Sequence, residues 1–344
     1  MSDFSQQADN LSQSPTAADL DTDLTSTKGE SVWLEYGFTG LVWIFALATV
    51  GLLFWLSWVI FKEARPAIQH FGLKFLWSQK WSIDNEEFGA LPYIYGTLVS
   101  SAIALLLAVP AGLAVAIVTS EDFLPAWVRS PLGFLVELIA AIPSVIVGLW
   151  GIFVLIPFLL PLQQWLFDHF KWIPLFSTEP FGPAMLSAGV VLAIMILPTV
   201  AAISRDILLV IPQELRSASM SLGATRWETI WNVLLPGAGS GILGAVILAL
   251  GRALGETMAV TMVIGNSIQI SPSLLAPGYT IPALLVNQFA EALDKLHIGA
   301  LMYLALILFA LTLVVNAIAM LMVQLIGGQG LKNVLRPLSF TKGE

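Results

Sequence analysis

Six long apolar stretches, almost free of charged residues, constrain this chain more than any other feature of its sequence. A bilayer core of about 30 Å is crossed by about 20 apolar residues in an α-helix. Such a helix also satisfies its own backbone hydrogen bonds in hydrocarbon, whereas a membrane β-barrel would show short alternating segments. The sequence therefore predicts an all-α polytopic membrane protein with six transmembrane helices, at about residues 38–61, 93–119, 132–158, 184–204, 239–265 and 299–326.

Composition agrees with this class and excludes several others. Only 11% of the 344 residues are charged, against roughly 25% in a soluble domain. The net charge of −8 argues against a nucleic-acid binder, which needs a basic face. Because the chain has no cysteine, it cannot form disulfides, thiolate zinc sites or iron–sulfur ligation. The three histidines lie in polar connecting stretches, which argues against a histidine metal site.

The two ends of the chain differ from the apolar body. Residues 1–30 carry six acids and one lysine, and they have too few apolar side chains to form a core. We expect an acidic, disordered tail there, and no signal peptide, because the segment does not start basic and then turn apolar. Residues 31–92 would hold the first helix and an external loop, 93–327 the transmembrane domain, and 328–344 a C-terminal tail.

Six crossings place both termini on one side of the membrane. Eight lysines and arginines fall in the segments on that side and six on the other. The excess favours cytoplasmic termini under the positive-inside rule.

The first predicted external loop, residues 62–92, mixes charges with Phe71, Phe75, Trp77 and Trp81. It is interpreted as an interfacial helix anchored by aromatic side chains. The alternative is a docking surface for an external partner.

Residues 205–237, between the fourth and fifth spans, predict a helix–glycine–helix hairpin. Pro212 suits the first turn of a helix, and Gly223 suits a left-handed end. Thr225 and Glu228 have the spacing of a capping box that starts a second helix, and Pro236 closes the unit. The second helix would carry one apolar face, formed at i, i+3, i+4 and i+7 by Trp227, Ile230, Trp231 and Leu234.

Three ionisable residues lie within the predicted spans: Glu137, Arg252 and Glu256. A charge at the bilayer centre costs about 2.5–3.5 kcal/mol on insertion scales. Arg252 and Glu256 are four residues apart, which predicts that they share a helix face within ion-pair reach. They would either fix one helix against another or serve an anion pathway. We favour the pathway, because buried ion pairs are poor stabilisers and an arginine fork suits an oxyanion.

Two further features accompany these charges. Gly251 and Gly255, with Gly244 on roughly the same face, would let another helix approach closely. Glu137 is predicted near the cytoplasmic start of the third helix, before a kink at Pro143. There it is either a near-interface carboxylate favoured by the helix dipole or a supporting residue of the pathway. Thr257, next to Glu256, is a second candidate for a supporting role.

The hairpin resembles the EAA loop of bacterial ABC importer permeases. That pattern is Glu-Ala-Ala, three residues, glycine, nine residues, then Ile-x-Leu-Pro. The corresponding residues here are Ser217, Ala218, Ser219, Gly223, Val233, Leu235 and Pro236. Ser217, Ser219 and Val233 depart from the pattern, while the glycine and the Leu-Pro exit are kept. The resemblance implies that the hairpin faces the cytoplasm and transmits closure of an ATPase subunit.

The sequence from Leu250 to Thr261, followed by Ile264-Gly265-Asn266, closely resembles the permease subunits of phosphate importers. Stretches in the first external loop and in the second, third and fourth spans agree, so the resemblance covers roughly residues 60–325. It implies the type I ABC importer permease fold in the bacterial inner membrane, with Arg252 and Glu256 as the pair critical for transport.

The resemblance also implies partners: a second related permease, two ATPase subunits, an external phosphate-binding protein and membrane lipid, but no nucleic acid. The chain has no Gly-x-x-x-x-Gly-Lys-Ser/Thr stretch, so we expect it to bind no cofactor, with ATP and magnesium held by the ATPase partner. Phosphate keeps an O–H at neutral pH and sulfate does not, so Glu256 would accept the proton of phosphate and repel sulfate.

Several alternatives stay open at this point. An ABC permease for another oxyanion, such as phosphonate, sulfate or molybdate, would share the fold. An ion-coupled secondary transporter would also use intramembrane charges, but it would not need the hairpin. A membrane-embedded enzyme has little support, because the spans hold no histidine, cysteine or metal-ligand cluster. A channel or scaffold would leave uptake independent of ATP.

Overall fold

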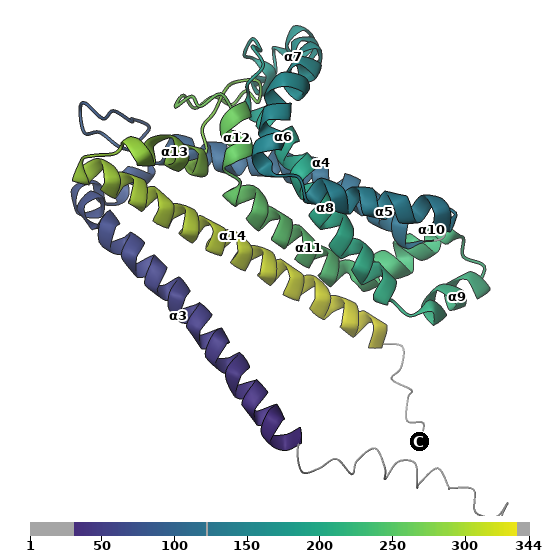
Figure 1. The fold of residues 1–344 in the computed structure, drawn as a ribbon. Helices are drawn as coiled ribbons and strands as arrows, with labels where there is room; N and C mark the ends of the chain where they lie inside the picture. The colour runs from purple at the N-terminus through teal and green to yellow at the C-terminus, as the bar shows by residue number, and fades with distance from the viewer. Residues whose placement is uncertain (1–30, 122, 336–344) are drawn as a thin grey trace, which may run out of the picture. The chain divides into compact units, whose positions relative to one another are not determined.

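The computed structural model describes residues 31–121 and 123–335 of the chain (Figure 1). Within these ranges the chain is helical, and its only β-structure is two isolated bridges, Ser82–Glu87 and Gly265–Gly278. Contacts divide the chain into two compact units, Met1–Val59 and Ile60–Glu344, and the site described below lies in the second. The expectations for residues 1–30 and for 336–344 lie outside the described residues.

Six helical stretches in the described part of the chain are long and apolar enough to cross a membrane. This confirms the predicted number of spans. The helices are α3 (Ser31–Phe71), α4 (Leu91–Ser120), α5 (Ala126–Ala140), α6 (Ser144–Trp150), α7 (Ile156–Phe170), α8 (Met185–Val210), α9 (Gln213–Ser221), α10 (Arg226–Thr229), α11 (Leu235–Gly255), α12 (Met258–Val263), α13 (Ile281–Gln288) and α14 (Lys295–Leu335). Two π-helical segments, Gly151–Leu155 and Ile230–Leu234, join α6 to α7 and α10 to α11.

The third span differs from the prediction. A helix break at Pro143, whose ψ of 136° is extended, separates α5 from α6. The span that can cross the membrane is Ser144–Phe170, so the predicted boundaries of 132–158 are wrong. Proline lacks the amide hydrogen that a continuous helix needs, yet the apolar residues on both sides of Pro143 conceal the break in a hydropathy pattern. Residues 132–140 belong to α5, a separate helix.

The fifth span is also shifted. The helical stretch runs from Arg226 to Gly255 through α10, the π-helical segment and α11. It ends at Glu256, whose φ of −67° and ψ of 127° are extended, and α12 follows as a separate short helix. The predicted span of 239–265 therefore begins too late and wrongly continues through this break.

α8 is the most buried of the six spans. A Cβ added at Gly112 of α4 would meet Val200 of α8 at 3.0 Å, and one at Gly241 of α11 would meet Ile207 of α8 at 2.8 Å. An added Cβ at Gly189 of α8 would collide with Ile103 of α4. Glycines thus permit the close approach of α4 and α11 to α8, and these helices run side by side in Figure 1.

The loop after α3 folds mostly onto its own unit. Phe75 is buried and stacks on Tyr303 of α14 with ring centroids 4.6 Å apart. The Trp81 indole N–H donates to Gln288 Oε1 at 2.8 Å. Phe75 and Trp81 therefore contact other residues of the same unit rather than a membrane surface or a partner. Trp77 remains exposed.

Candidate functional site

Arg252 lies in the last turn of α11, where the carbonyl end of the helix favours a cation. Its side chain is exposed, and Nη1 donates to Thr199 Oγ1 of α8 at 3.3 Å. Arg252 also lines a cavity of about 270 Å³, whose other walls are apolar. They are formed by Ile139, Ile142, Ile146, Val147, Trp150, Ile194 and Met195. Arg252 is therefore the single cation at the edge of an apolar cavity.

One face of α11 is open. Gly244, Leu248, Arg252 and Gly255 are all exposed, and a Cβ added at Gly244, Gly251 or Gly255 would meet nothing within 4 Å. The expectation that these glycines admit another helix is not met by any described segment of this chain. The small-residue stripe and the cation share a surface that the described residues leave uncovered.

Glu256 does not pair with Arg252 among the described residues. The i, i+4 geometry requires a continuous helix, and α11 ends at Gly255. Glu256 Oε1 instead accepts from the backbone N–H of Ala259 at 3.4 Å, in the first turn of α12. Thr257 Oγ1 donates to the Gly255 carbonyl at 3.1 Å. The predicted shared face and ion pair are thus wrong, although both charged residues remain at the same helix break.

Glu137 is not brought to this site. It is an exposed residue of α5 and lines a different, very small cavity together with Arg205 of α8. Arg205 Nε is buried there and has no hydrogen-bond partner in the described residues. Because α5 is separate from the third span, the predicted position of Glu137 at the start of that span is wrong.

The hairpin has the local geometry that its sequence predicts. Gly223 has a φ of +89°, and the N–H groups of Gly223 and Ala224 donate to the carbonyls of Met220 and Ser219 at 3.0 and 3.3 Å. This is the Schellman end of a helix, which favours glycine. Thr225 and Glu228 form the capping box, with Thr225 N–H donating to Glu228 Oε2 at 2.7 Å. Pro212 is the residue just before α9 rather than within its first turn.

The motif residues of the hairpin divide into exposed and internal groups. Ser217, Ala218, Gly223 and Pro236 are exposed, while Leu235 is half-buried. The Ser219 hydroxyl lies 2.9 Å from the Thr229 hydroxyl and joins the two arms of the hairpin. One of the departures from the EAA pattern, serine at 219, therefore supplies a contact that alanine could not make.

The predicted apolar face of the second arm is split. Ile230 and Leu234 are buried in a small core with α4 and α8, but Trp227 and Trp231 are exposed. The π-helical turn of Ile230–Leu234 explains the difference, because its i→i+5 bonds change the angular spacing of successive side chains.

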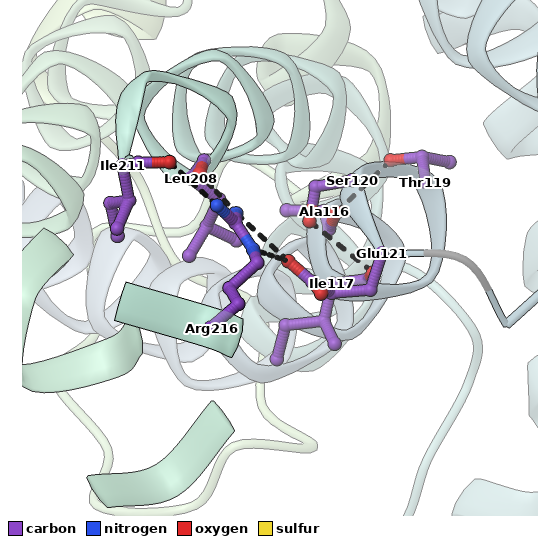
Figure 2. Close-up of polar contacts among 8 residues, drawn as sticks. All are labelled: Ala116, Ile117, Thr119, Ser120, Glu121, Leu208, Ile211 and Arg216. Carbon is purple, nitrogen blue, oxygen red and sulfur yellow. Dashed lines mark hydrogen bonds and ion pairs between the residues drawn. The ribbon is translucent and has the colours of Figure 1, made fainter. Parts of the chain in front are cut away.

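Arg216 of α9 is a buried charged side chain of the hairpin with several partners (Figure 2). Its Nη2 lies 3.0 Å from Glu121 Oε1, just past the end of α4, and Nε donates to the same oxygen at 3.2 Å. Nη1 donates to the Ile211 carbonyl at 2.6 Å, and Nη2 also donates to the Leu208 carbonyl at 2.8 Å. Only 7% of Arg216 is exposed. One side chain therefore joins α9 to the ends of α4 and α8.

Sequence reasoning missed this cluster. In the sequence analysis, Arg216 is only one of the eight lysines and arginines that favour cytoplasmic termini. Its partner Glu121 is 95 residues away in the chain, so no local spacing connects them. The only signal was the presence of a charged residue in a helix that starts directly after a membrane span.

Comparison with known proteins identifies what this arrangement is similar to. Residues 108–328 match the family model described as the binding-protein-dependent transport system inner membrane component. A phosphate transport system permease protein PstC of Xylella fastidiosa is 45% identical over 263 residues, covering 75% of this chain and 81% of that protein. A protein of the same name from Mesorhizobium japonicum is 46% identical over 265 residues, covering 76% and 81%.

A solved structure supports the fold independently. The crystal structure of a bacterial alginate ABC transporter, in complex with an alginate-bound periplasmic protein, contains a chain that is 17% identical to this one. The match has a TM-score of 0.55 and covers 84% of this chain and 96% of that chain. The fold is therefore that of an ABC importer permease.

Proposed function

Because this chain belongs to the PstC family of phosphate transport permeases, within the binding-protein-dependent inner membrane components, we propose a role for each part of its site. The chain is a multi-pass membrane protein and a permease subunit of an ABC importer for inorganic phosphate. Arg252 is the anion-binding residue of the pathway, and the hairpin couples that pathway to ATP hydrolysis in a partner.

The position of Arg252 on the open face of α11 carries this proposal. An arginine exposed to lipid would be costly, and no described segment of this chain covers it. A second, related permease packed over the stripe of Gly244, Leu248 and Gly255 would shield it. The apolar walls beside Arg252 would then strengthen its attraction for an oxyanion, because the local dielectric constant is low. The guanidinium would bind phosphate oxygens through its planar fork.

Glu256 has a different role in the proposal. It lies at the same helix break as Arg252 but is hydrogen-bonded to α12, so it does not neutralise the arginine. Its carboxylate would accept the proton that phosphate keeps at neutral pH and would repel sulfate, which has none. Thr257 beside it is a further candidate donor to a bound anion. Glu137, which lines a different cavity, is assigned no contact with phosphate.

The exposed surface of the hairpin supports the coupling role. Leu222 at the tip is 91% exposed, and Met220 and Trp227 nearby are also exposed. With the exposed Ser217 and Ala218, they form an apolar surface suited to the cleft of an ATPase subunit. An external phosphate-binding protein would deliver the substrate at the opposite side. The hairpin and both termini would then face the cytoplasm of a bacterial cell.

Reconstitution tests the proposal. The chain is combined in liposomes with a second permease, two ATPase subunits and an external phosphate-binding protein, and phosphate uptake and ATP hydrolysis are measured together. We expect phosphate-dependent hydrolysis and uptake by the wild type, and loss of uptake in Arg252→Ala. Full uptake by Arg252→Ala would refute the site. Uptake of sulfate or molybdate in place of phosphate would favour the alternative oxyanion permease.

The Glu256→Gln variant tests selectivity separately. Glutamine keeps the size and the hydrogen-bond acceptor but removes the negative charge. We expect phosphate uptake to fall and sulfate to compete more strongly. Unchanged discrimination between phosphate and sulfate would show that Glu256 does not select between them.

A further inference from the structure

We propose that Arg216 is a positioning residue for transport, which fixes the hairpin to α8 so that the two move as one body and carry Thr199 with them. This inference rests on the proposed function, because it assumes that the hairpin receives the movement of an ATPase. It adds the physical connection between the hairpin and Arg252.

The first step is the attachment of the hairpin. Arg216 makes four hydrogen bonds to three acceptors, Glu121, Leu208 and Ile211, and is almost fully buried. Two of these acceptors are backbone carbonyls at the end of α8 and just beyond it, where the regular helical hydrogen bonding stops; the Leu208 carbonyl also accepts the Ile211 N–H at 3.4 Å. A planar guanidinium held by four bonds has little freedom to rotate. The end of α8 is therefore expected to follow any displacement of α9.

The second step is a helix segment that can move as a unit. Pro198 lies inside α8 and leaves the Ile194 carbonyl without its usual backbone donor. Thr199 follows directly, and α8 then continues without interruption to the residues that bind Arg216. Thr199 and Leu208 are nine residues apart, which is about 14 Å along a helix. Pro198 is thus placed as a hinge, and Thr199 lies on the same side of it as Arg216.

The third step is the contact with the pathway. Thr199 Oγ1 accepts the hydrogen bond from Arg252 Nη1 at 3.3 Å. A rotation of the segment from Pro198 to Val210 about its hinge would lengthen or shorten this contact. The hairpin would then change the orientation of Arg252 in each transport cycle, through α8 and without a direct contact between the two arginines.

A purely structural role is the main competing explanation. Buried ion pairs often contribute little net stability compared with well-packed apolar residues. The test must therefore measure coupling rather than folding. Since this chain has no cysteine, paired spin labels can be introduced at Ser221 of the hairpin and Val210 of α8, both exposed, in a complex whose partner subunits have also been freed of reactive cysteine.

The first experiment measures whether hairpin and α8 move together. Ser221→Cys and Val210→Cys are labelled in the full complex, after confirming that it still hydrolyses ATP. We expect the same label-to-label distance with and without ATP, and a broader, ATP-dependent distribution when Arg216→Met is added. A wild-type distance that changes with ATP would overturn the proposal.

The second experiment measures phosphate taken up per ATP hydrolysed. For Arg216→Met we expect an about tenfold drop, within the range by which residues along a coupling route act. Arg216→Lys, which keeps the charge but loses the fork, and Glu121→Gln should lie between this variant and the wild type. Glu214→Gln, an exposed residue of α9, is the matched control and should couple normally.

The outcomes separate this inference from the proposed function. A wild-type complex without phosphate-dependent ATP hydrolysis would refute the proposed function. A functional wild type together with an unchanged uptake per ATP in Arg216→Met would refute the role of Arg216 alone. If the Arg216→Met variant does not assemble, the uptake per ATP of Arg216→Lys and Glu121→Gln tests the proposal instead. Normal coupling in both of these variants would overturn it.

Discussion

Arg216 and Arg252 are both arginines at the ends of membrane-spanning segments, and their surroundings are opposite. Arg216 is 7% exposed and makes four hydrogen bonds within its own chain. Arg252 is exposed and makes one bond of 3.3 Å to a threonine. The glycines near them differ in backbone conformation, since Gly223 ends a helix at a φ of +89°, while Gly255 is helical and has open space for a side chain.

This difference separates a charge that stabilises the fold from a charge that the fold does not need for its stability. At the hairpin end, the buried Arg216 has acceptors within the chain for four hydrogen bonds, so a substitution there should act on stability as well as on coupling. On the open face of α11, Arg252 makes a single hydrogen bond, to Thr199, and no described segment packs over the small residues, so a substitution there should act on transport or assembly. The predictions below test this division.

Arg216→Met should produce the largest effect on stability. Removing one partner of a buried ion pair typically costs about 3–5 kcal/mol, because the remaining charge stays buried. Glu121 is partly accessible, with 18% of its side chain exposed, so the lower end of this range is expected. Denaturant unfolding of the purified complex measures the change. A midpoint equal to that of the wild type would contradict the view that the fold depends on this contact.

Arg252→Met should show the reverse pattern. We expect the free energy of unfolding to change by less than about 0.5 kcal/mol, as for other exposed substitutions. Uptake should fall by about 10- to 150-fold, which corresponds to losing a charge-assisted hydrogen bond worth about 1.5–3 kcal/mol. Uptake assays test the expected loss of transport, and the same unfolding measurement tests the expected unchanged stability. A large loss of stability would show that Arg252, like Arg216, stabilises the fold, and would contradict the division between the two arginines.

Gly223→Ala and Gly255→Ala form a matched pair. A Cβ at the left-handed φ of Gly223 costs roughly 1–2 kcal/mol, so this variant should be destabilised. Gly255 has open space around it, and its variant should stay within about 0.5 kcal/mol of the wild type. Thermal unfolding of the two variants side by side gives the comparison. Equal losses would mean that the hairpin turn is not specially constrained.

Ser219→Ala should destabilise the hairpin less than Gly223→Ala does. It removes the hydroxyl contact with Thr229 and restores the alanine of the EAA pattern. The expected cost is about 1 kcal/mol, the typical value of one hydrogen bond, with Thr229→Val as the matched variant from the other arm. If a double-variant cycle shows no coupling energy between the two positions, the arms are not held by this contact.

The sequence allowed the six spans, the hairpin with its glycine end and capping box, and the family resemblance to be predicted, because each depends on local spacing or on a contiguous string. At Pro143 it predicted a kink within a continuous third span, whereas the helix breaks there, and at Glu256 it predicted no interruption. Apolar runs continue across both, and hydropathy does not respond to backbone dihedral angles. The separation of Arg252 from Glu256 follows from the second break.

The Arg216–Glu121 contact was out of reach for a different reason. It depends on tertiary packing of α4, α8 and α9, and the two residues are 95 positions apart. A single sequence contains no record of that proximity. The open face of α11 was likewise unpredictable, because small residues indicate close packing without showing whether the partner helix belongs to the same chain.

The π-helical turn at Ile230–Leu234 has a consequence far from its own position. It lies at the base of the continuous helical stretch that ends at Gly255, so it sets the rotational phase of every later residue. Each residue of an α-helix turns by about 100°. This turn holds one residue more than a regular α-helical turn, so deleting one residue there would restore the regular helix and leave Arg252 close to its present direction. A deletion in α11 itself would instead rotate Arg252 by roughly that angle relative to the hairpin. In evolutionary terms, the π-helical turn is the place where this span can gain or lose a residue without redirecting its cation.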